Sequence, residues 1–285
     1  MVDVLVIGAG PAGISAAIYA KRAGASVLVL YNGESNLEKA HKIDNYYGFE
    51  NGIDGKSLYQ AGINQARNLE IEVKEEEVYN IKKENNIFTI ESEKINYESK
   101  AVIIATGNKK LRPNIKGIEE LEGKGVSYCA ICDGFFYRKK DVAVIGNGKF
   151  AIKEADDLKN IANSITILTN GEKIVDNSGY IVDTRKIKEI HGENKVSSVE
   201  FDDGNKMQID GVFVAIGEAG GADFAKKLGV ILKGDSIETD ENMKTNIDGL
   251  YSCGNANGGL LQVCKATYEG AKAGLAAVQY IKENK

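Results

Sequence analysis

Two stretches of the chain show the same order of apolar and polar positions. The first runs from an apolar segment at Asp3–Ile7 through a glycine-rich turn and a helical stretch to a second apolar segment at Val27–Leu30. The second repeats this order, with apolar segments at Val142–Ile145 and Ile165–Leu168. Short apolar strands on either side of a helix that begins at glycines are typical of a βαβ unit. The pattern therefore predicts two dinucleotide-binding folds.

Short strand-like segments follow each of these units. After the first unit they are Val78–Ile81, Ile87–Ile90 and Ile95–Tyr97. After the second they are Tyr180–Asp183, Val196–Phe201 and Met207–Ile209, with a turn signal at Asp203 and Gly204. Such runs separated by turn residues predict a small antiparallel meander in each half.

The segment after Thr245 does not begin a third unit. It contains a short apolar run, Leu250–Ser252, and an alanine-rich helical stretch from about Val263 to Lys282. We expect it to return to the first domain. The predicted fold class is therefore α/β, with two Rossmann-like domains that each carry a small antiparallel meander, the second inserted in the first.

Composition and charge narrow the choice of partners. The 285 residues are 43% hydrophobic and 27% charged with only 2 prolines, as expected for a globular protein of about two domains. A net charge of -5 argues against nucleic acid as a partner, which requires a basic face. The chain enters its first strand directly after Met1, and apolar runs stay well short of the ~20 residues of a membrane span. We expect a cytoplasmic protein without membrane contact.

The first glycine motif has the chemistry of a pyrophosphate site. Gly8, Gly10 and Gly13 lie between a strand and a helix, where free N–H groups face an anion and side chains would block its approach. An acidic residue usually follows the second strand to hold a ribose, but Tyr31 stands there. The ribose contact is therefore not predicted.

The second glycine motif is less suited to a nucleotide. Lys149 and Phe150 place long side chains where the loop should be open, and the next strand ends in Thr169, Asn170 and Gly171. NADPH needs Arg or Lys at that turn, and NADH needs Asp or Glu. The motif indicates a retained fold that has lost its ligand.

Cys129 and Cys132 are the chemical centre of the sequence. Two thiols separated by two residues indicate redox or metal chemistry, and a thiolate is the attacking form. With only two histidines, neither near a cysteine, a metal site is not expected. The following Asp133 could move a proton. Cys253 and Cys264 lie in apolar runs, and we expect them to be core residues without a redox role.

At these residues the chain closely resembles low-molecular-weight thioredoxin reductases over nearly its whole length. The shared motifs are GAGPAG at 8 to 13, IDNYYG at 43 to 48, VIIATG at 102 to 107, SYCAICDGFFYR at 127 to 138, and TNIDGLYSCGN at 245 to 255. LQVCKATYEGAKA follows in the same order.

The resemblance implies an FAD-binding domain at 1–111 and 242–285, interrupted by a disulfide domain with a degenerate NADPH-type fold at 112–241. It implies a homodimer, thioredoxin as partner, and hinges near 112 and 241 about which the two domains rotate. The FAD contacts that it implies are Gly8, Gly10, Pro11, Gly13, Asn45, Val78, Ala105, Thr106, Gly107, Gly254, Asn255, Gln262 and Val263.

The resemblance also implies roles for the reactive residues. Cys132 receives electrons from the flavin, Cys129 attacks the disulfide of thioredoxin, and Asp133 acts as the acid and base. Asn255 departs from the family pattern, which has an aspartate there; an amide can still form hydrogen bonds but carries no charge.

The largest departure concerns the electron source, because the basic run of the NADPH-using members is absent after Thr169. This pattern looks like the pyridine-nucleotide-independent, ferredoxin-linked flavin thioredoxin reductases, which implies ferredoxin as the donor. The basic pair Lys109 and Lys110 is a candidate dock for it. Two alternatives stay open: an NAD(P)H-dependent thioredoxin reductase with an atypical nucleotide site, and a flavin and disulfide redox sensor.

Overall fold

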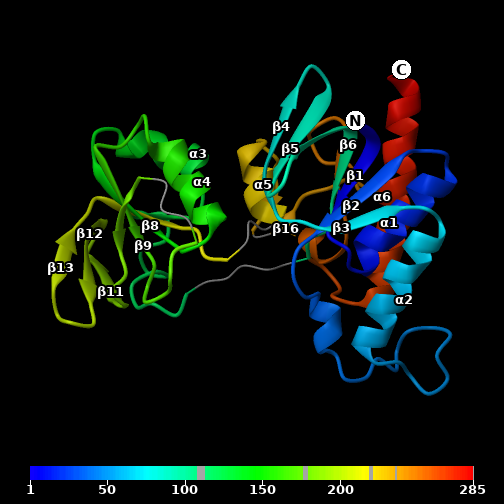
Figure 1. Ribbon diagram of the computed structural model, residues 1–285, viewed down its shortest axis with the longest axis horizontal. Coiled ribbons are helices and arrows are strands. Elements are labelled where there is room, and N and C mark those ends of the chain that lie inside the picture. Colours follow the sequence, from blue (N-terminus) through cyan, green and yellow to red (C-terminus); the bar gives the residue numbers. More distant parts are fainter. Residues whose placement is uncertain (108–112, 176–178, 218–220, 235, 285) are drawn as a thin grey trace. The chain divides into compact units, whose positions relative to one another are not determined.

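The chain folds into two compact units, which a computed structural model describes for residues 1–107, 113–175, 179–217, 221–234 and 236–284. The first unit combines residues 1–109 with the segment that begins at residue 220, and residues 110–219 form the second (Figure 1). The second unit is thus inserted in the first. This confirms the predicted fold class.

The first unit is built on a sheet whose centre is parallel. β1 (Val2–Ile7) pairs with β2 (Val27–Tyr31) on one side and β6 (Asn96–Ile104) on the other. β3 (Glu72–Glu75) extends the sheet beyond β2, and β17 (Leu250–Ser252) pairs with the end of β6. Because β1, β6 and β17 run in the same direction, the segments that follow them meet at one edge of the sheet.

The antiparallel part of this sheet is the first predicted meander. β4 (Val78–Glu84) pairs with β5 (Ile87–Ser92), and β5 pairs with the first half of β6. The third predicted run, Ile95–Tyr97, is the beginning of β6, which continues to Ile104. One strand therefore joins the meander to the parallel centre.

The long helices of the first unit are α1 (Pro11–Arg22), α2 (Gly55–Asn68) and α6 (Val263–Glu283). α1 and α6 lie side by side (Figure 1). A Cβ atom added at Gly270 would lie 2.1 Å from the carbonyl oxygen of Ala12, so glycine in α6 is what permits this close approach. Within the described residues, no helix combines the length and apolar character that crossing a bilayer requires.

The chain returns to the first unit earlier than the predicted residue 242. Helix α5 (Gly221–Lys227) and the hairpin of β15 (Leu232–Lys233) and β16 (Ser236–Ile237) all come before residue 242 and pack in this unit. Their apolar side chains explain this, because Phe224 is buried. The same unit also contains the 3-10 helix η1 (Asn36–Lys39), before α2. The hinges expected near 112 and 241 stay predictions, and residue 112 lies outside the described residues.

The second unit repeats the parallel arrangement. β8 (Asp141–Ile145) pairs with β9 (Ser164–Leu168) and with β14 (Gly211–Val214), and β7 (Val126–Ser127) pairs with β14. α4 (Lys149–Leu158) packs on β8 and β9. The second βαβ prediction is confirmed.

The second meander differs from the prediction in its first strand. It consists of β11 (Ile187–Gly192), β12 (Val196–Phe201) and β13 (Lys206–Gln208). The predicted strand Tyr180–Asp183 instead supplies β10 (Ile181–Asp183), which adds in parallel to β9. The reason is that β11 pairs with register shifts and buries positions three apart, so its sequence lacks the alternation of a half-buried strand.

Candidate active site

Three of the predicted FAD-binding segments meet at the carboxyl edge of the first sheet. Gly8 follows β1 and its N–H donates to the carbonyl of Leu30 at 2.7 Å. The segment 105–107 follows β6, and the N–H of Ala105 donates to the carbonyl of Ile7 at 2.8 Å. Cys253 follows β17 and its N–H donates to the carbonyl of Ile104 at 3.0 Å, and Gly254 and Asn255 come next. The register of three parallel strands therefore brings together residues almost 250 positions apart, at the edge where open α/β sheets bind ligands.

The three glycines of the first turn are needed for different reasons. A Cβ at Gly8 would lie 2.3 Å from the carbonyl oxygen of Ala105, and one at Gly13 would lie 1.8 Å from the carbonyl oxygen of Gly8. The backbone packing itself thus requires both. A Cβ at Gly10 would meet only the Ser35 hydroxyl oxygen, at 3.8 Å, so the protein fold leaves room there.

The first turn of α1 is suited to an anion. Gly10 is its N-cap, Pro11 is its first residue, and within the described chain no side chain caps its N–H groups. Free N–H groups at a helix N-terminus, next to space that a side chain would fill, are what a pyrophosphate requires. The residues present therefore fit the phosphates of FAD.

The structure also connects predicted residues of the other FAD segments. The side-chain amide of Asn45 donates to the Gln262 side-chain oxygen at 2.9 Å, and Val263 begins α6 directly after it. Val78 is buried at the start of β4, two residues after Glu76, whose N–H donates to the carbonyl of Tyr31 at 2.7 Å. Val78 thus lies near the end of β2, where an adenosine would be expected.

An ion pair on α6 holds the turn that carries Asn255. Glu269 accepts a hydrogen bond from the N–H of Gly254 at 2.8 Å, and Lys265 donates to the carbonyls of Gly254 and Gly258 at 2.9 and 2.6 Å. The two side chains pair at 3.1 Å and are both mostly buried. Sequence reasoning missed them. Their spacing of four on a helix was the available signal, but it does not reveal which loop they face.

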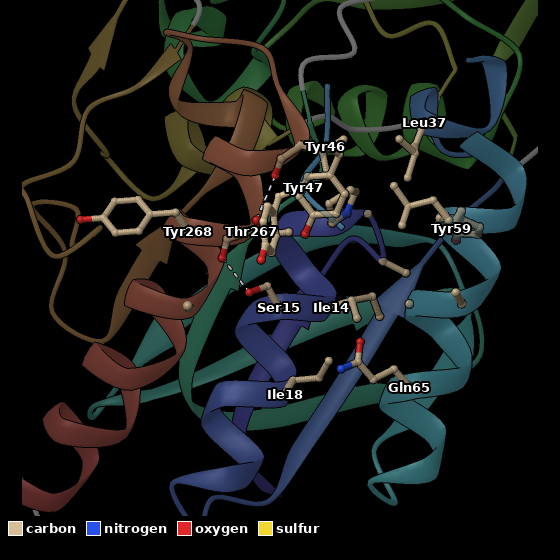
Figure 2. A pocket seen from close by; sticks show the side chains of 18 of the residues that line it. Ile14, Ser15, Ile18, Leu37, Tyr46, Tyr47, Tyr59, Gln65, Thr267 and Tyr268 are labelled. Atoms are coloured by element: carbon tan, nitrogen blue, oxygen red, sulfur yellow. Dashed lines mark hydrogen bonds between the residues drawn. The ribbon is translucent and has the colours of Figure 1, made fainter. Parts of the chain in front are cut away.

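A cavity of about 690 Å³ lies beside the glycine turn, between α1, α2 and α6 (Figure 2). Figure 2 shows Ser15 of α1 directed toward α6, where its hydroxyl donates to the carbonyl of Thr267 at 2.7 Å. Of the predicted FAD contacts, the cavity includes Gly10, Pro11 and Val263. Most of its lining is instead a set of helix faces and exposed tyrosines, which differs from the strand edge where the FAD segments meet.

The second unit presents the reactive disulfide. Cys129 and Cys132 are bonded to each other across the short helix α3 (Ala130–Asp133). Cys129 is buried and Cys132 is exposed. Ile131 and, in the following 3-10 helix η2 (Gly134–Tyr137), Phe135 and Phe136 are large apolar residues with more than half of their surface exposed. The disulfide therefore lies in an apolar surface.

Two buried side chains hold the backbone at this disulfide, and the sequence had not pointed to either. The Ser127 hydroxyl accepts from the N–H of Cys129 at 3.1 Å and donates to Asp133 at 2.6 Å. Glu154 of α4 accepts from the N–H of Ala130 at 2.7 Å and is 1% exposed. The structure thus brings together the three predicted reactive residues and adds two that fix them.

The second glycine turn is bound by the protein's own chain. Asn147 in this turn accepts a hydrogen bond from the N–H of Val175 at 2.9 Å through its carbonyl oxygen, and its side chain donates to the carbonyl of Lys173 at 3.3 Å. The prediction that Phe150 crowds the turn is wrong, because Phe150 is 3% exposed and packs in the core against β8. The segment after β9, and not a side chain of the helix, lies against the turn.

The two other cysteines have different surroundings. Cys253 is fully buried, as predicted for a core residue, and burial raises the pKa of its thiol. Cys264 is exposed, so its expected place in the core is wrong. It lies at the second position of α6, where it faces away from the packed side of the helix.

Two dinucleotide-type folds, one of them presenting a Cys-x-x-Cys disulfide, define a disulfide reductase. The chain matches the pyridine nucleotide-disulphide oxidoreductase family over residues 2–270 and belongs to that family. This confirms the resemblance. The chain is a flavoprotein disulfide reductase of the thioredoxin reductase type, with FAD as its cofactor.

Three known proteins illustrate this similarity. The atypical thioredoxin reductase TRi of Desulfovibrio vulgaris Hildenborough has a TM-score of 0.92 and 38% identity, with 99% of both chains covered. A ferredoxin-flavin thioredoxin reductase of Clostridium acetobutylicum has a TM-score of 0.72 and 32% identity, covering 99% of this chain and 98% of the other. The thioredoxin reductase of Bacillus subtilis is 32% identical over 301 residues, covering 99% of this chain and 95% of that protein.

Proposed function

We propose that this protein reduces thioredoxin through the Cys129–Cys132 disulfide and that reduced ferredoxin supplies the electrons to its FAD. The observation that carries the choice of donor is the segment bound to the second glycine turn. In a nucleotide-binding unit that turn faces the pyrophosphate. Here Asn147 uses both its carbonyl and its amide to bind residues 173 and 175 of the same chain.

The end of β9 supports the same choice. The Asn170 side chain accepts from the N–H of Ile187 at 2.8 Å, so it is engaged with the backbone. Arg185, which follows β10, binds the carboxylates of Asp183 and Asp203 at 3.0 and 3.3 Å. A 2'-phosphate would have to compete with two carboxylates for that guanidinium. NADPH recognition is therefore disfavoured at this turn.

Bound FAD would supply the conversion between a one-electron donor and the two-electron disulfide. Reduction potentials near -400 mV for plant-type ferredoxins and -270 mV for thioredoxin leave about 6 kcal/mol for the transfer of two electrons. The route is downhill. We assign the FAD contacts to the thirteen residues predicted for them.

The two sulfurs of the disulfide take different steps. We assign Cys132 as the acceptor of electrons from the flavin, as the family resemblance implies. Once the bond is open, the Cys129 thiolate attacks the substrate disulfide, forms a mixed disulfide and expels one substrate thiolate. Cys132 then attacks the Cys129 sulfur, which restores the enzyme disulfide and releases the second thiolate. The two thiol protons of the enzyme pass to the substrate, with Asp133 carrying them.

The apolar surface around the disulfide is suited to a protein substrate. Ile131, Phe135 and Phe136 surround the reactive pair and are 51%, 72% and 70% exposed. Contiguous exposed apolar residues mark interaction sites, and aromatic residues are enriched in interface centres. We propose that thioredoxin covers these three side chains when its disulfide meets Cys129.

Two further partners belong to this proposal. Ferredoxins are typically acidic, and the expected dock at Lys109 and Lys110 lies outside the described residues. If opposite charges hold ferredoxin there, its association with the enzyme weakens as the salt concentration rises. The proposed homodimer would use the helix faces around the cavity, where Tyr268 is 61% exposed and Tyr19 is 44% exposed. Light scattering of the wild type and of Tyr268→Glu tests it. A monomeric wild type contradicts it.

The test of the donor is stopped-flow bleaching of the flavin under strict anaerobiosis. Reduced ferredoxin, NADPH and NADH are compared at equal concentrations, and an NADPH-dependent thioredoxin reductase is the positive control for the nucleotides. We expect rapid bleaching by ferredoxin alone, slowed by added salt. Rapid bleaching by NADPH at micromolar concentration would contradict the ferredoxin assignment and favour the nucleotide-dependent alternative.

Multiple turnover distinguishes a reductase from the alternative of a flavin and disulfide redox sensor. A flavin and disulfide sensor changes state once for each reduction, whereas a reductase continues while donor and oxidised thioredoxin last. We expect many thioredoxin molecules to be reduced by each enzyme molecule. A single stoichiometric cycle followed by arrest would support the sensor.

A further inference from the structure

Ser127 joins the reactive cysteine to the acid that serves it. It is the last residue of β7, and its register partner on β14 is Phe213, so its position is fixed by the parallel sheet. Its side chain is buried, with 6% of the residue exposed. A buried hydroxyl that bonds two parts of the same site holds their relative position at a small entropic cost.

The hydroxyl is used on both sides. Its oxygen accepts the N–H of Cys129 at 3.1 Å, and its proton goes to a carboxylate oxygen of Asp133 at 2.6 Å. Cys129 and Asp133 stand at opposite ends of α3, and the N–H of Asp133 donates to the Cys129 carbonyl at 3.1 Å. Ser127 adds a connection through the side chain, which the helical hydrogen bond does not provide.

The same hydroxyl has a second acceptor within reach. The carbonyl oxygen of Cys129 lies 3.4 Å from the Ser127 oxygen. When Asp133 is ionised, the hydroxyl donates to its carboxylate. When Asp133 carries a proton, its O–H can donate to the Ser127 oxygen while the hydroxyl turns toward the Cys129 carbonyl. Ser127 can therefore keep Asp133 in place in both protonation states.

We propose that Ser127 is a positioning residue that holds Asp133 beside Cys129 through the proton transfers of disulfide exchange. The inference rests on the proposed function of Asp133 and not on the identity of the electron donor. In the step concerned, the Cys129 thiol gives its proton to the Asp133 carboxylate and the thiolate attacks the substrate disulfide. Asp133 then gives that proton to the expelled thiolate, so the carboxylate is restored and the mixed disulfide remains.

The nature of the leaving thiolate provides a selective test. An alkyl thiolate, such as that of thioredoxin, is a basic leaving group that benefits from a proton, whereas an aryl thiolate leaves readily without one. Loss of Ser127 should therefore slow the reduction of thioredoxin more than the reduction of dithiobis(nitrobenzoate). A variant with a merely weakened fold would slow both alike.

The experiment uses the full-length FAD protein, reduced chemically before mixing so that no biological donor is needed. Ser127→Ala, Ser127→Thr, Asp133→Asn and the double variant Ser127→Ala/Asp133→Asn are mixed with each disulfide. We expect Ser127→Ala to slow thioredoxin reduction about tenfold or more, since general acids contribute about 10² to 10⁴ in rate. The loss with the aryl disulfide should be several-fold smaller, and threonine, which keeps the hydroxyl, should restore the rate.

The double variant decides between positioning and packing. If Ser127 acts through Asp133, adding Ser127→Ala to Asp133→Asn costs little further rate. The proposal would be overturned if the rate losses of the two single variants multiplied in the double variant. It would also be overturned if Ser127→Ala slowed the reduction of both disulfides equally. Unchanged FAD content and thermal unfolding of Ser127→Ala show that the fold is retained. A wild type that reduces the aryl disulfide and not thioredoxin would instead contradict the proposed function, while the comparison of variants on an alkyl disulfide such as hydroxyethyl disulfide still tests Ser127.

Discussion

Gly10→Val should remove FAD from the protein without unfolding it. The added Cβ meets only the Ser35 hydroxyl oxygen, at 3.8 Å, and the backbone at residue 10 has φ -70° and ψ -178°, an extended conformation that valine adopts readily. The Cβ that valine adds and its backbone conformation are therefore compatible with the protein alone. Its side chain occupies the space in front of the α1 N-terminus that the pyrophosphate needs.

The size of the effect follows from the hydrogen bonds that are lost. A hydrogen bond to a charged group contributes about 1.5–3 kcal/mol, so displacing the pyrophosphate from two N–H groups costs about 3–6 kcal/mol. That corresponds to a fall in FAD affinity of about 10²- to 10⁴-fold. Gly10→Ala, which adds one methyl group, should have an FAD affinity between those of the wild type and Gly10→Val.

The assay is a fluorescence titration of deflavinated protein with FAD, together with thermal unfolding of the same samples. Gly8→Val is the matched control: its Cβ would lie 2.3 Å from the Ala105 carbonyl oxygen and φ is +110°, so the fold itself should be destabilised. Wild-type FAD affinity in Gly10→Val would refute the reasoning. So would unfolding of the Gly10→Val apoprotein at the lowered temperature expected of Gly8→Val.

Three further predictions concern other parts of the molecule. Glu269→Gln should weaken FAD binding about tenfold by loosening the turn that it holds, and unchanged affinity in the same titration would count against that role. Lys100, followed by Ser26, lowers the pKa of Asp3 from 3.8 to about 2. Because this folded-state pKa is depressed, Asp3→Asn should lower the unfolding free energy at pH 7 by up to about 2 kcal/mol. That gap should close as pH falls from about 4 to about 2, and urea melts that show a constant gap would contradict this. Iodoacetamide should modify exposed Cys264 and spare buried Cys253 in the native oxidised protein, and mass spectrometry showing the reverse would contradict the burial argument.

The sequence predicts those features whose cause is local. Gly13 is a glycine because its Cβ would lie 1.8 Å from the carbonyl oxygen of Gly8, and Gly8 has a φ of +110° that favours glycine, so both requirements arise within six residues. The same holds for the disulfide, because Cys129 and Cys132 are fixed in spacing by a single turn of α3. Local constraints of this kind leave a pattern that can be recognised without the fold.

Features that depend on distant contacts are not predictable in this way. Ser127 precedes the Cys-x-x-Cys motif, but nothing in its own sequence shows that its hydroxyl meets Asp133. Phe150 looks like an obstruction to the second glycine turn because the core that receives it is formed by strands elsewhere in the chain. The segment at 173–175 has no signature at all, since its effect arises from where it folds.

The segment bound to the second glycine turn competes with a nucleotide for that turn, so the loss of nucleotide affinity can be estimated from the hydrogen bonds involved. The two hydrogen bonds between Asn147 and the segment at 173–175 contribute about 0.5–1.5 kcal/mol each, and displacing them would weaken nucleotide binding by about 5- to 150-fold. The turn at 169–171 carries no charged side chain, so a nucleotide also lacks the charge-assisted hydrogen bonds of an ordinary site. Each missing bond lowers its binding free energy by about 1.5–3 kcal/mol. A micromolar site would thus become a millimolar one without vanishing. Slow bleaching at millimolar NADPH is therefore compatible with ferredoxin as the donor, and the comparison that matters is the rate at equal, low donor concentration.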